Sequence, residues 1–225
     1  MYAKFWKRII DFVLSLGALI VLSPVILVLT VVGAIKMKGN PFFTQVRPGK
    51  DEKLFKLIKF RSMTCEKDKN GNLLPDEKRL TKYGKFIRST SLDELPELIN
   101  IIKGDMSIVG PRPQLVRDMV FMTPEQRRRH SVRAGLTGLA QINGRNCVTW
   151  EQKLDYDLEY IKNITFAEDL RIVIKTFEKV LKRDGISSEG METAEDFGDY
   201  LLKYEYVTEE EYVKKQKKAK ELIGV

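Results

Sequence analysis

Residues 12–35 read FVLSLGALIVLSPVILVLTVVGAI, a run of 24 residues without a charged side chain that Ser23 and Pro24 interrupt near its midpoint. A straight helix of that length would measure about 36 Å, enough for the ~30 Å hydrocarbon core of a bilayer. Proline removes a backbone N–H and clashes with the preceding turn, so Pro24 is expected to break or kink the helix. The segment therefore predicts membrane association by two short apolar helices.

Basic residues flank this run on both sides, and positive charge prefers the cytoplasmic side of a bacterial membrane. They are Lys4, Lys7 and Arg8 before the run and Lys36, Lys38, Arg47, Lys50 and Lys53 after it. We therefore expect a re-entrant helix-break-helix with both ends on one side, in which Ser23 satisfies a carbonyl freed at the break. The alternative is an ordinary kinked span. A cleaved signal peptide is not expected, because the apolar run is too long and no small-residue cleavage site follows it.

The composition limits the domain organisation and the chemistry that are possible for the rest of the chain. We expect a membrane helix over residues 1–38, one globular domain over 39–186 and a tail with a terminal helix over 187–225. The net charge is +8 and the pI is near 9.3, which suits anionic lipid, phosphorylated substrates and nucleic acid equally well. The single histidine, His130, argues against a Ser–His hydrolase and excludes a His-rich zinc site. Carboxylates and arginines must therefore supply the chemistry.

The periodicity of the globular part predicts an α+β fold that is mostly helical. Two apolar arms, 42–46 and 53–60, flank a turn at 47–50 and predict a small β-hairpin. Apolar spacing predicts helices over 150–162 and 168–183. Thr123 and Thr208 each precede a capping-box pattern and are expected to begin two further helices.

The candidate chemistry is centred on residues 91–98, which read SLDELPEL. Ser91 and Glu94 have the spacing of a capping box, and Asp93 could itself cap a helix, so both acids fit a structural role. The alternative is that Asp93 is a nucleophile that attacks phosphorus. A carboxylate at a helix N-terminus stays ionised, and the resulting acyl-phosphate would lie where helix N–H groups bind anions.

Basic residues in short, turn-rich segments around these acids favour the functional interpretation. The rigid position of Arg112 between Pro111 and Pro113 leaves its guanidinium little freedom to lose on binding. Such a guanidinium is a good bidentate clamp for phosphate, although surface solvation remains the alternative for any one arginine. The cations in question are Lys59, Arg61, Arg88, Arg112 and Arg145.

Four ordered motifs carry a resemblance to a known family: KFRSM at 59–63, SLDELPEL at 91–98, KGDMSIVGPRP at 103–113 and GLTGLAQINGR at 135–145. They resemble the signatures of bacterial sugar transferases, and more narrowly those of the small monotopic polyprenyl-phosphate phosphoglycosyl transferases that initiate bacterial glycan assembly. The resemblance runs from about residue 4 to residue 190 and includes Ser23 and Pro24. Two departures are Ala134, where many members have proline, and the segment after about residue 198, which extends beyond the shortest members.

The resemblance implies a reaction. Asp93 would attack the sugar-bearing phosphorus of a UDP-sugar, UMP would leave, and undecaprenyl phosphate would take the phosphosugar from the covalent intermediate. Mg²⁺ near Asp93 and Glu94, with Glu94 favoured as a metal ligand, would stabilise the phosphoryl oxygens together with basic residues that bind phosphate. Those residues would be Lys59, Arg88, Arg112 and Arg145, with Pro111 and Pro113 supporting the loop. The segment 185–198 resembles members that use N-acetylated amino sugars, particularly di-N-acetylbacillosamine.

The same resemblance implies the cytoplasmic membrane of a bacterium, with residues 39–186 as a catalytic domain on the cytoplasmic face. UDP-sugar, polyprenyl phosphate and membrane lipid are the expected partners, with self-association or glycosyltransferases of the same pathway as further expectations. Two alternatives stay open: a membrane-anchored basic scaffold, and a glycosyltransferase that releases UDP, whose isolated DXD motif is not evident. Nucleic acid is not expected as a partner, because no recognition-helix motif accompanies the high pI.

Overall fold

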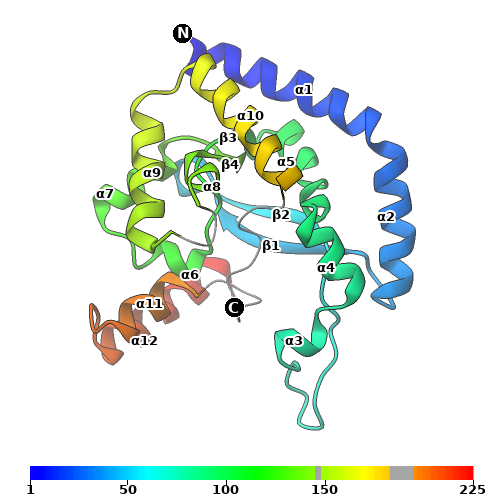
Figure 1. Cartoon of the computed structure of the whole chain (residues 1–225). Helices are drawn as coiled ribbons and strands as arrows, with labels where there is room; N and C mark the ends of the chain where they lie inside the picture. Colours follow the sequence, from blue (N-terminus) through cyan, green and yellow to red (C-terminus); the bar gives the residue numbers. More distant parts are fainter. Residues whose placement is uncertain (145–147, 183–194, 225) are drawn as a thin grey trace.

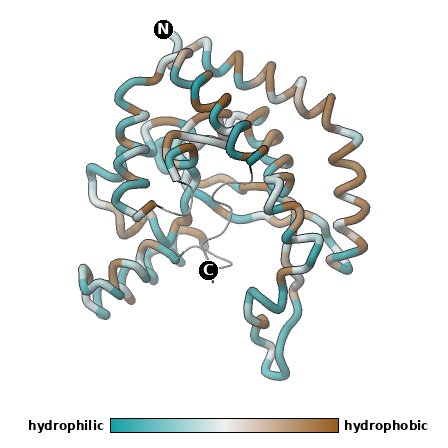
Figure 2. The backbone as a smooth tube through the Cα atoms, viewed as in Figure 1, coloured by the Kyte–Doolittle hydropathy of each residue, from teal (hydrophilic) through white to brown (hydrophobic). Residues whose placement is uncertain are grey.

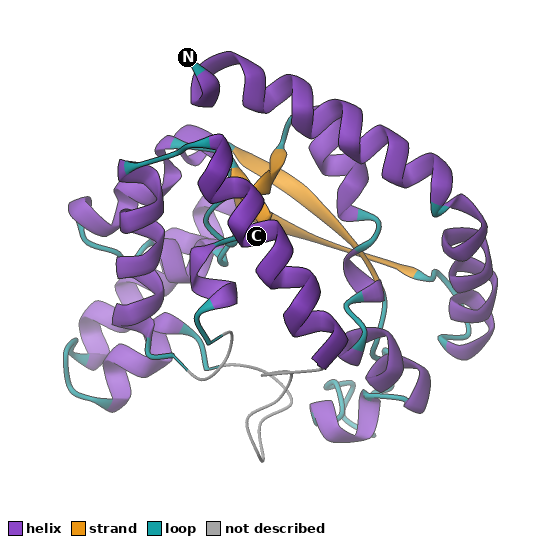
Figure 3. Ribbon diagram, turned by 45° about the horizontal axis from the view of Figure 1, so that its top comes forward, coloured by secondary structure: helices purple, strands orange, loops and turns teal. Residues whose placement is uncertain are grey.

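The structure is a computed structural model and describes residues 1–144, 148–182 and 195–224. Helices surround two small two-stranded sheets, which confirms the prediction of a mostly helical α+β fold (Figure 3).

The N-terminal segment forms two helices that meet at the predicted break. A π-helical turn (Tyr2–Trp6) runs into α1 (Lys7–Val21), and α2 (Ser23–Lys36) follows at a bend of 63° (Figure 1). Pro24 lies in the first turn of α2, where its missing N–H costs no hydrogen bond, and the Ser23 hydroxyl donates to the carbonyl of Ile20 at 2.7 Å. Among the described residues no single helix is long and apolar enough to cross a membrane, whereas the bent pair together meets that test.

The helices α1 and α2 are rich in hydrophobic residues (Figure 2), and many of their apolar side chains are exposed. Large apolar surfaces of this kind mark a membrane or a protein interface rather than an ordinary solvated face. The most exposed side chains, each at least half exposed, include Val13, Leu14, Ile20, Val21, Leu27, Val28, Val31 and Ile35.

The inner face of α1 joins the helix to the globular domain through polar contacts of Arg8 and Asp11 and through apolar packing of Ala18 and Leu19. Arg8 donates to the carbonyls of Ile101 and Ile102 at 2.6 and 2.8 Å, in the last turn of α5 (Glu97–Lys103), where a cation is favoured by the helix dipole. Asp11 is 4% exposed and accepts the backbone N–H of Ile108 at 3.1 Å. Arg8 therefore links α1 to the domain. It is also one of the basic residues that flank the apolar run.

Asp169 on α10 (Phe166–Lys182) holds the beginning of the chain. Its Oδ2 atom accepts from the Tyr2 hydroxyl and from Lys7 Nζ, both at 2.6 Å, and its Oδ1 atom accepts from the Tyr160 hydroxyl at 2.7 Å. Lys7 is thus an ion-pair partner inside the protein, and one carboxylate joins the distant Tyr2 and Lys7 to the nearby Tyr160.

Replacing Asp169 with Ala is expected to lower the free energy of unfolding by about 3–5 kcal/mol, because it leaves the mostly buried Lys7 ammonium without its counter-charge. The control is Glu168→Ala, which removes a more exposed ion pair with Arg171 and should cost less than about 1 kcal/mol. Urea unfolding of the detergent-solubilised variants measures both values. Equal losses in the two variants would contradict the anchoring role of Asp169.

The predicted hairpin is confirmed as β1 (Phe42–Pro48) paired antiparallel with β2 (Leu54–Phe60). Asn100 on α5 accepts the N–H of Ile58 at 3.1 Å and donates to the carbonyl of Lys56 at 2.8 Å. Asn100 therefore satisfies the free edge of β2 and fixes α5 against the hairpin.

A second pair of strands was not predicted. The strands β3 (Met106–Val109) and β4 (Ala134–Thr137) run parallel, and their contact continues where the Gly110 N–H donates to the carbonyl of Thr137 at 2.9 Å. A Cβ atom at Gly135 would lie 2.1 Å from the Gly110 nitrogen, so only glycine permits this approach. The pair fixes the point at which residues 111–113 leave the sheet.

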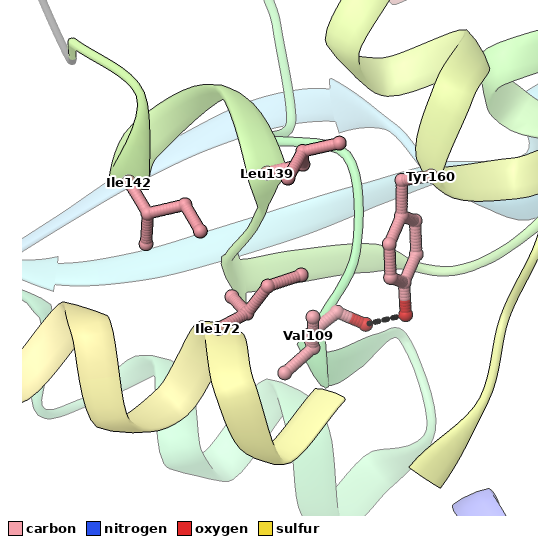
Figure 4. Packing of buried hydrophobic residues seen from close by; sticks show 5 residues of the cluster. All are labelled: Val109, Leu139, Ile142, Tyr160 and Ile172. Atoms are coloured by element: carbon pink, nitrogen blue, oxygen red, sulfur yellow. Dashed lines mark hydrogen bonds between the residues drawn. The ribbon is translucent and has the colours of Figure 1, made fainter. Parts of the chain in front are cut away.

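The helices of the second half lie where the sequence placed them. α9 (Trp150–Lys162) and α10 pack with α8 (Leu139–Ile142) around the apolar cluster of Figure 4, where the Tyr160 hydroxyl oxygen also lies 3.2 Å from the carbonyl oxygen of Val109. Thr123 caps its helix with a capping box, as predicted. The shorter helices are α3 (Asp76–Arg79), α4 (Lys82–Ser89), α6 (Val116–Met119) and α7 (Pro124–Arg127).

The described part of the tail packs into the domain. It forms α11 (Phe197–Lys203) and α12 (Glu209–Ile223), the latter with the predicted capping box at Thr208. Phe197 packs with Phe121 and Trp150, and Ala219 packs with Val116 and Met119. The tail therefore completes the hydrophobic core beside α6.

Candidate active site

Asp93 and Glu94 lie in a short 3₁₀ turn (Leu92–Glu94) between α4 and α5. Ser91 has a left-handed backbone with φ of 55° and makes no side-chain cap, and Pro96 occupies the N-cap position of α5. The capping-box interpretation of Ser91, Asp93 and Glu94 is therefore wrong. The turn leaves both carboxylates free to serve other contacts.

Four elements converge on Glu94. Its Oε1 atom lies 2.8 Å from Lys59 Nζ on β2 and 2.7 Å from Arg112 Nη2 in the loop after β3. Lys59 Nζ also lies 3.0 Å from Oε1 of Glu97, which is 2% exposed in α5. The structure thus brings together Lys59, Glu94 and Arg112 as the sequence predicts, and adds Glu97, which belongs to the same SLDELPEL motif but was not named as a site residue.

The two adjacent acids differ in their pKa values. Burial opposes the ionisation of Glu94, but Arg112 and Lys59 outweigh it and hold the pKa of Glu94 well below its usual range. Burial, and then repulsion by ionised Glu94, raises the pKa of Asp93 to about 6. Glu94 is therefore a fixed negative charge, whereas Asp93 is the more basic and hence the more nucleophilic carboxylate.

The surroundings of Asp93 leave it accessible for chemistry. In residues 1–144, 148–182 and 195–224 its carboxylate has no hydrogen-bond partner. Arg88 on α4 donates from Nε to the Ser62 hydroxyl at 2.9 Å, and its charge acts to lower the pKa of Asp93. The predicted phosphate-binding Arg145 lies outside the described residues, so its role stays a prediction.

The loop that carries Arg112 has buried proline residues on both sides, Pro111 and Pro113, while the Arg112 side chain is 43% exposed. The carbonyl of Arg112 accepts from Nη2 of Arg129 at 2.5 Å, and the carbonyl of Pro113 accepts from Nη1 of Arg47 at 3.1 Å. From the sequence, Arg47 was expected only as a charge that flanks the apolar run and Arg129 was given no role, so neither contact was predicted.

The basic run 127–130 is accounted for by acids within the protein. Arg127 pairs with Glu52, Arg128 lies 2.7 Å from Glu125, and Arg129 lies 2.7 Å from Asp157. Burial, and then the charge of Arg129, lowers the pKa of His130 to about 4, so the imidazole is neutral. The run therefore offers little unpaired charge to an anionic partner.

The donor set around Asp93 fits a magnesium ion that arrives with a substrate. No group of three or more histidine, cysteine or acidic side chains could enclose a metal in the described part of the chain. Protein-bound Mg²⁺ commonly uses one or two carboxylates together with substrate phosphates. The repulsion between Asp93 and Glu94 that raises the pKa of Asp93 is what a divalent cation would relieve.

Comparisons with known proteins agree with the family resemblance of the four sequence motifs. Residues 2–183 match the family described as bacterial sugar transferase. The chain is 49% identical over 191 residues to the uncharacterized sugar transferase EpsL of Bacillus subtilis, covering 85% of this chain and 95% of that protein.

Two longer relatives have names that state a reaction. The UDP-glucose:undecaprenyl-phosphate glucose-1-phosphate transferase of Klebsiella pneumoniae is 42% identical over 184 residues, which are 77% of this chain and 40% of that protein. The undecaprenyl-phosphate galactose phosphotransferase of Salmonella typhimurium is 37% identical over 202 residues, which are 81% and 42% of the two chains. The chain thus spans about two fifths of the length of these two relatives.

Proposed function

The chain belongs to the bacterial sugar transferase family, and from that membership we propose that it transfers a phosphosugar from a UDP-sugar to undecaprenyl phosphate and releases UMP. The names of the two longer relatives support this reaction class. The observation that carries the proposal is the Asp93 carboxylate, which has no hydrogen bond in the described residues and lies beside the cluster of Lys59, Glu94 and Arg112.

In the proposed first step the Asp93 carboxylate attacks the sugar-bearing phosphorus of the UDP-sugar. A bond forms between the carboxylate oxygen and phosphorus, the bond from phosphorus to the UMP oxygen breaks, and UMP leaves with that electron pair. An oxygen of undecaprenyl phosphate then attacks the same phosphorus and frees Asp93. Phosphoryl transfer depends on neutralising the negative charge of the phosphoryl oxygens, and Arg112, Arg88 and Lys59 would supply positive charge for this. Mg²⁺ held by Asp93 and Glu94 would add charge stabilisation when bound.

The membrane arrangement is part of the proposal. Undecaprenyl phosphate stays in the bilayer, so the site must lie at its surface. The exposed apolar faces of α1 and α2 and the 63° bend between them support a re-entrant pair with both ends on one side of the membrane. The basic residues that flank the apolar run favour the cytoplasmic side. The polar contacts of Arg8 and Asp11 then fix the domain to that pair.

The proposed sugar is an N-acetylated amino sugar such as di-N-acetylbacillosamine, on the strength of the sequence of residues 185–198 alone. The two relatives described above are named for glucose and galactose, so those sugars are the competing substrates. A test panel must therefore contain the UDP derivatives of all three.

The deciding experiment identifies the nucleotide released by detergent-solubilised protein with Mg²⁺, undecaprenyl phosphate and that panel. We expect UMP with one sugar strongly preferred. UDP would identify a glycosyltransferase. Absence of any nucleotide from folded protein would favour the membrane-anchored scaffold instead.

Removal of divalent cations is expected to lower UMP release at least about 100-fold, because the charge developing on phosphoryl oxygens then loses its strongest neutralising group. The measurement is the initial rate after treatment with a chelator, with and without added Mg²⁺. Thermal unfolding should be unchanged by the chelator, since the described residues contain no structural metal cluster. Full activity in the chelator would contradict the magnesium requirement.

A further inference from the structure

The loop that carries Arg112 is held from behind by two arginines, of which Arg129 is buried and Arg47 is half-buried. Nη2 of Arg129 donates to the carbonyl of Arg112 at 2.5 Å, and Nη1 of Arg47 donates to the next carbonyl, that of Pro113, at 3.1 Å. Arg129 comes from the 3₁₀ turn Arg128–Ser131 and Arg47 comes from β1. Hydrogen bonds from charged donors are stronger than those between neutral groups, so both peptide groups are held firmly.

Arg129 is itself held by Asp157 on α9. The Nε and Nη2 atoms of Arg129 lie 2.8 and 2.7 Å from Oδ2 of Asp157, and the two side chains are only 1% and 3% exposed. Because Nη2 carries two N–H groups, it serves the carboxylate and the carbonyl of Arg112 together. A lysine could not reproduce this geometry, since its ammonium lacks the planar fork.

The stability of the fold does not explain this arrangement. Replacing a buried ion pair with well-packed apolar residues is often neutral or stabilising, because both charges lose their hydration. The Oδ1 atom of Asp157 also lacks a hydrogen-bond partner in the described residues, so the desolvation of this acid is only partly compensated. What the pair does provide is a guanidinium in a fixed orientation beside the loop.

We propose that Arg129, oriented by Asp157, is a positioning residue that sets the place of Arg112 in the active site. The inference rests on the proposed function, in which Arg112 binds a phosphate of the UDP-sugar. Arg129 is 2% exposed and acts only through the backbone of Arg112. The exposed Arg112 guanidinium reaches Glu94 at 2.7 Å only if that backbone is correctly placed.

The first test is Arg129→Lys, which keeps the positive charge but removes the planar guanidinium with its fixed N–H donors. We expect kcat/KM for the UDP-sugar to fall about 10- to 100-fold, the effect of a small misplacement of a binding group. The matched control is Arg128→Lys at the adjacent position, where the arginine is 58% exposed and pairs with Glu125. That control should change kcat/KM less than about 2-fold. Equal activity of the two variants would overturn the proposal.

A double-mutant cycle separates positioning from general stabilisation. In an Arg112→Ala background, Arg129→Lys should lower kcat/KM by less than about a further 2-fold, because the group that it positions is gone. A structural role would give the same loss in both backgrounds and would overturn the proposal. If thermal unfolding shows that Arg129→Lys does not fold, Asp157→Asn enters the same cycle with the same two outcomes, since it keeps the shape of the carboxylate and removes its charge.

The nucleotide that the wild type releases shows whether the proposed function fails or only the positioning role of Arg129. A wild-type protein that releases UDP or no nucleotide refutes the proposed function, and the positioning role falls with it. A wild type that releases UMP, while Arg129→Lys shows the full loss in both backgrounds, refutes the positioning role alone.

Discussion

Replacing Asp93 with Asn is expected to lower the rate of UMP release at least about 10⁴-fold, the scale of loss seen when an enzyme loses its nucleophile. An amide of the same shape has no negative oxygen with which to form the acyl-phosphate. The environment of Asp93 supports this role, because burial and the charge of Glu94 raise its pKa to about 6 while Glu94 keeps its contacts with Lys59 and Arg112. The measurement is UMP release under saturating UDP-sugar.

The control for this prediction is Asp155→Asn, which makes the same chemical change at an exposed position on α9. It should retain the wild-type rate within about 2-fold. Both variants should unfold at temperatures close to that of the wild type, because Asp93 has no hydrogen bond to lose in the described residues. An Asp93→Asn protein that keeps a tenth or more of the wild-type rate would assign the nucleophile to another residue, and a loss of stability with activity intact would favour the scaffold.

Replacing Arg112 with Ala is expected to lower kcat/KM for the UDP-sugar about 10²- to 10³-fold, the usual cost of removing one preorganised charge donor from a transition state. Its guanidinium lies 2.7 Å from Glu94 and is 43% exposed, so it can face the carboxylate and a substrate phosphate together. Arg112→Lys should recover only part of the loss, because an ammonium cannot bind in the bidentate manner.

Arg117→Ala is the matched control for Arg112. Arg117 lies in α6, immediately after the same loop, is 52% exposed and pairs with Asp196. Its loss should change kcat/KM by less than about 2-fold, since exposed ion pairs contribute little. Similar losses from Arg117→Ala and Arg112→Ala would mean that overall positive charge, rather than the position of Arg112, is what the substrate requires.

The sequence predicted the elements that local chemistry determines. Pro24 ended α1, the alternation after Lys53 gave β2, and Thr208 capped α12. The strands β3 and β4 were missed because each has only four residues in a glycine-rich motif and because their pairing is parallel and distant in sequence. Such strands carry no alternating pattern of their own.

The site was predictable to a similar extent. Lys59, Glu94 and Arg112 were expected near one another from their motifs, and the structure places them within ion-pair distance. Arg129 could not be distinguished from Arg128 in the sequence, because its burial depends on Asp157, 28 positions away. In the sequence the three adjacent arginines at 127–129 look alike. Only the fold shows that each of them pairs with a different acid.

The contacts of Asp169 also constrain the order of events during synthesis. Tyr2 and Lys7 precede their partner by 167 and 162 positions. At roughly 5–20 residues per second, a ribosome needs on the order of ten seconds to make the intervening chain. Throughout that interval the apolar helices α1 and α2 exist without the domain that later packs against Leu29 and forms hydrogen bonds with Arg8 and Asp11. We therefore expect the nascent segment that contains α1 and α2 to contact lipid or a chaperone before the domain folds. Purified, refolded protein would lack this order of events.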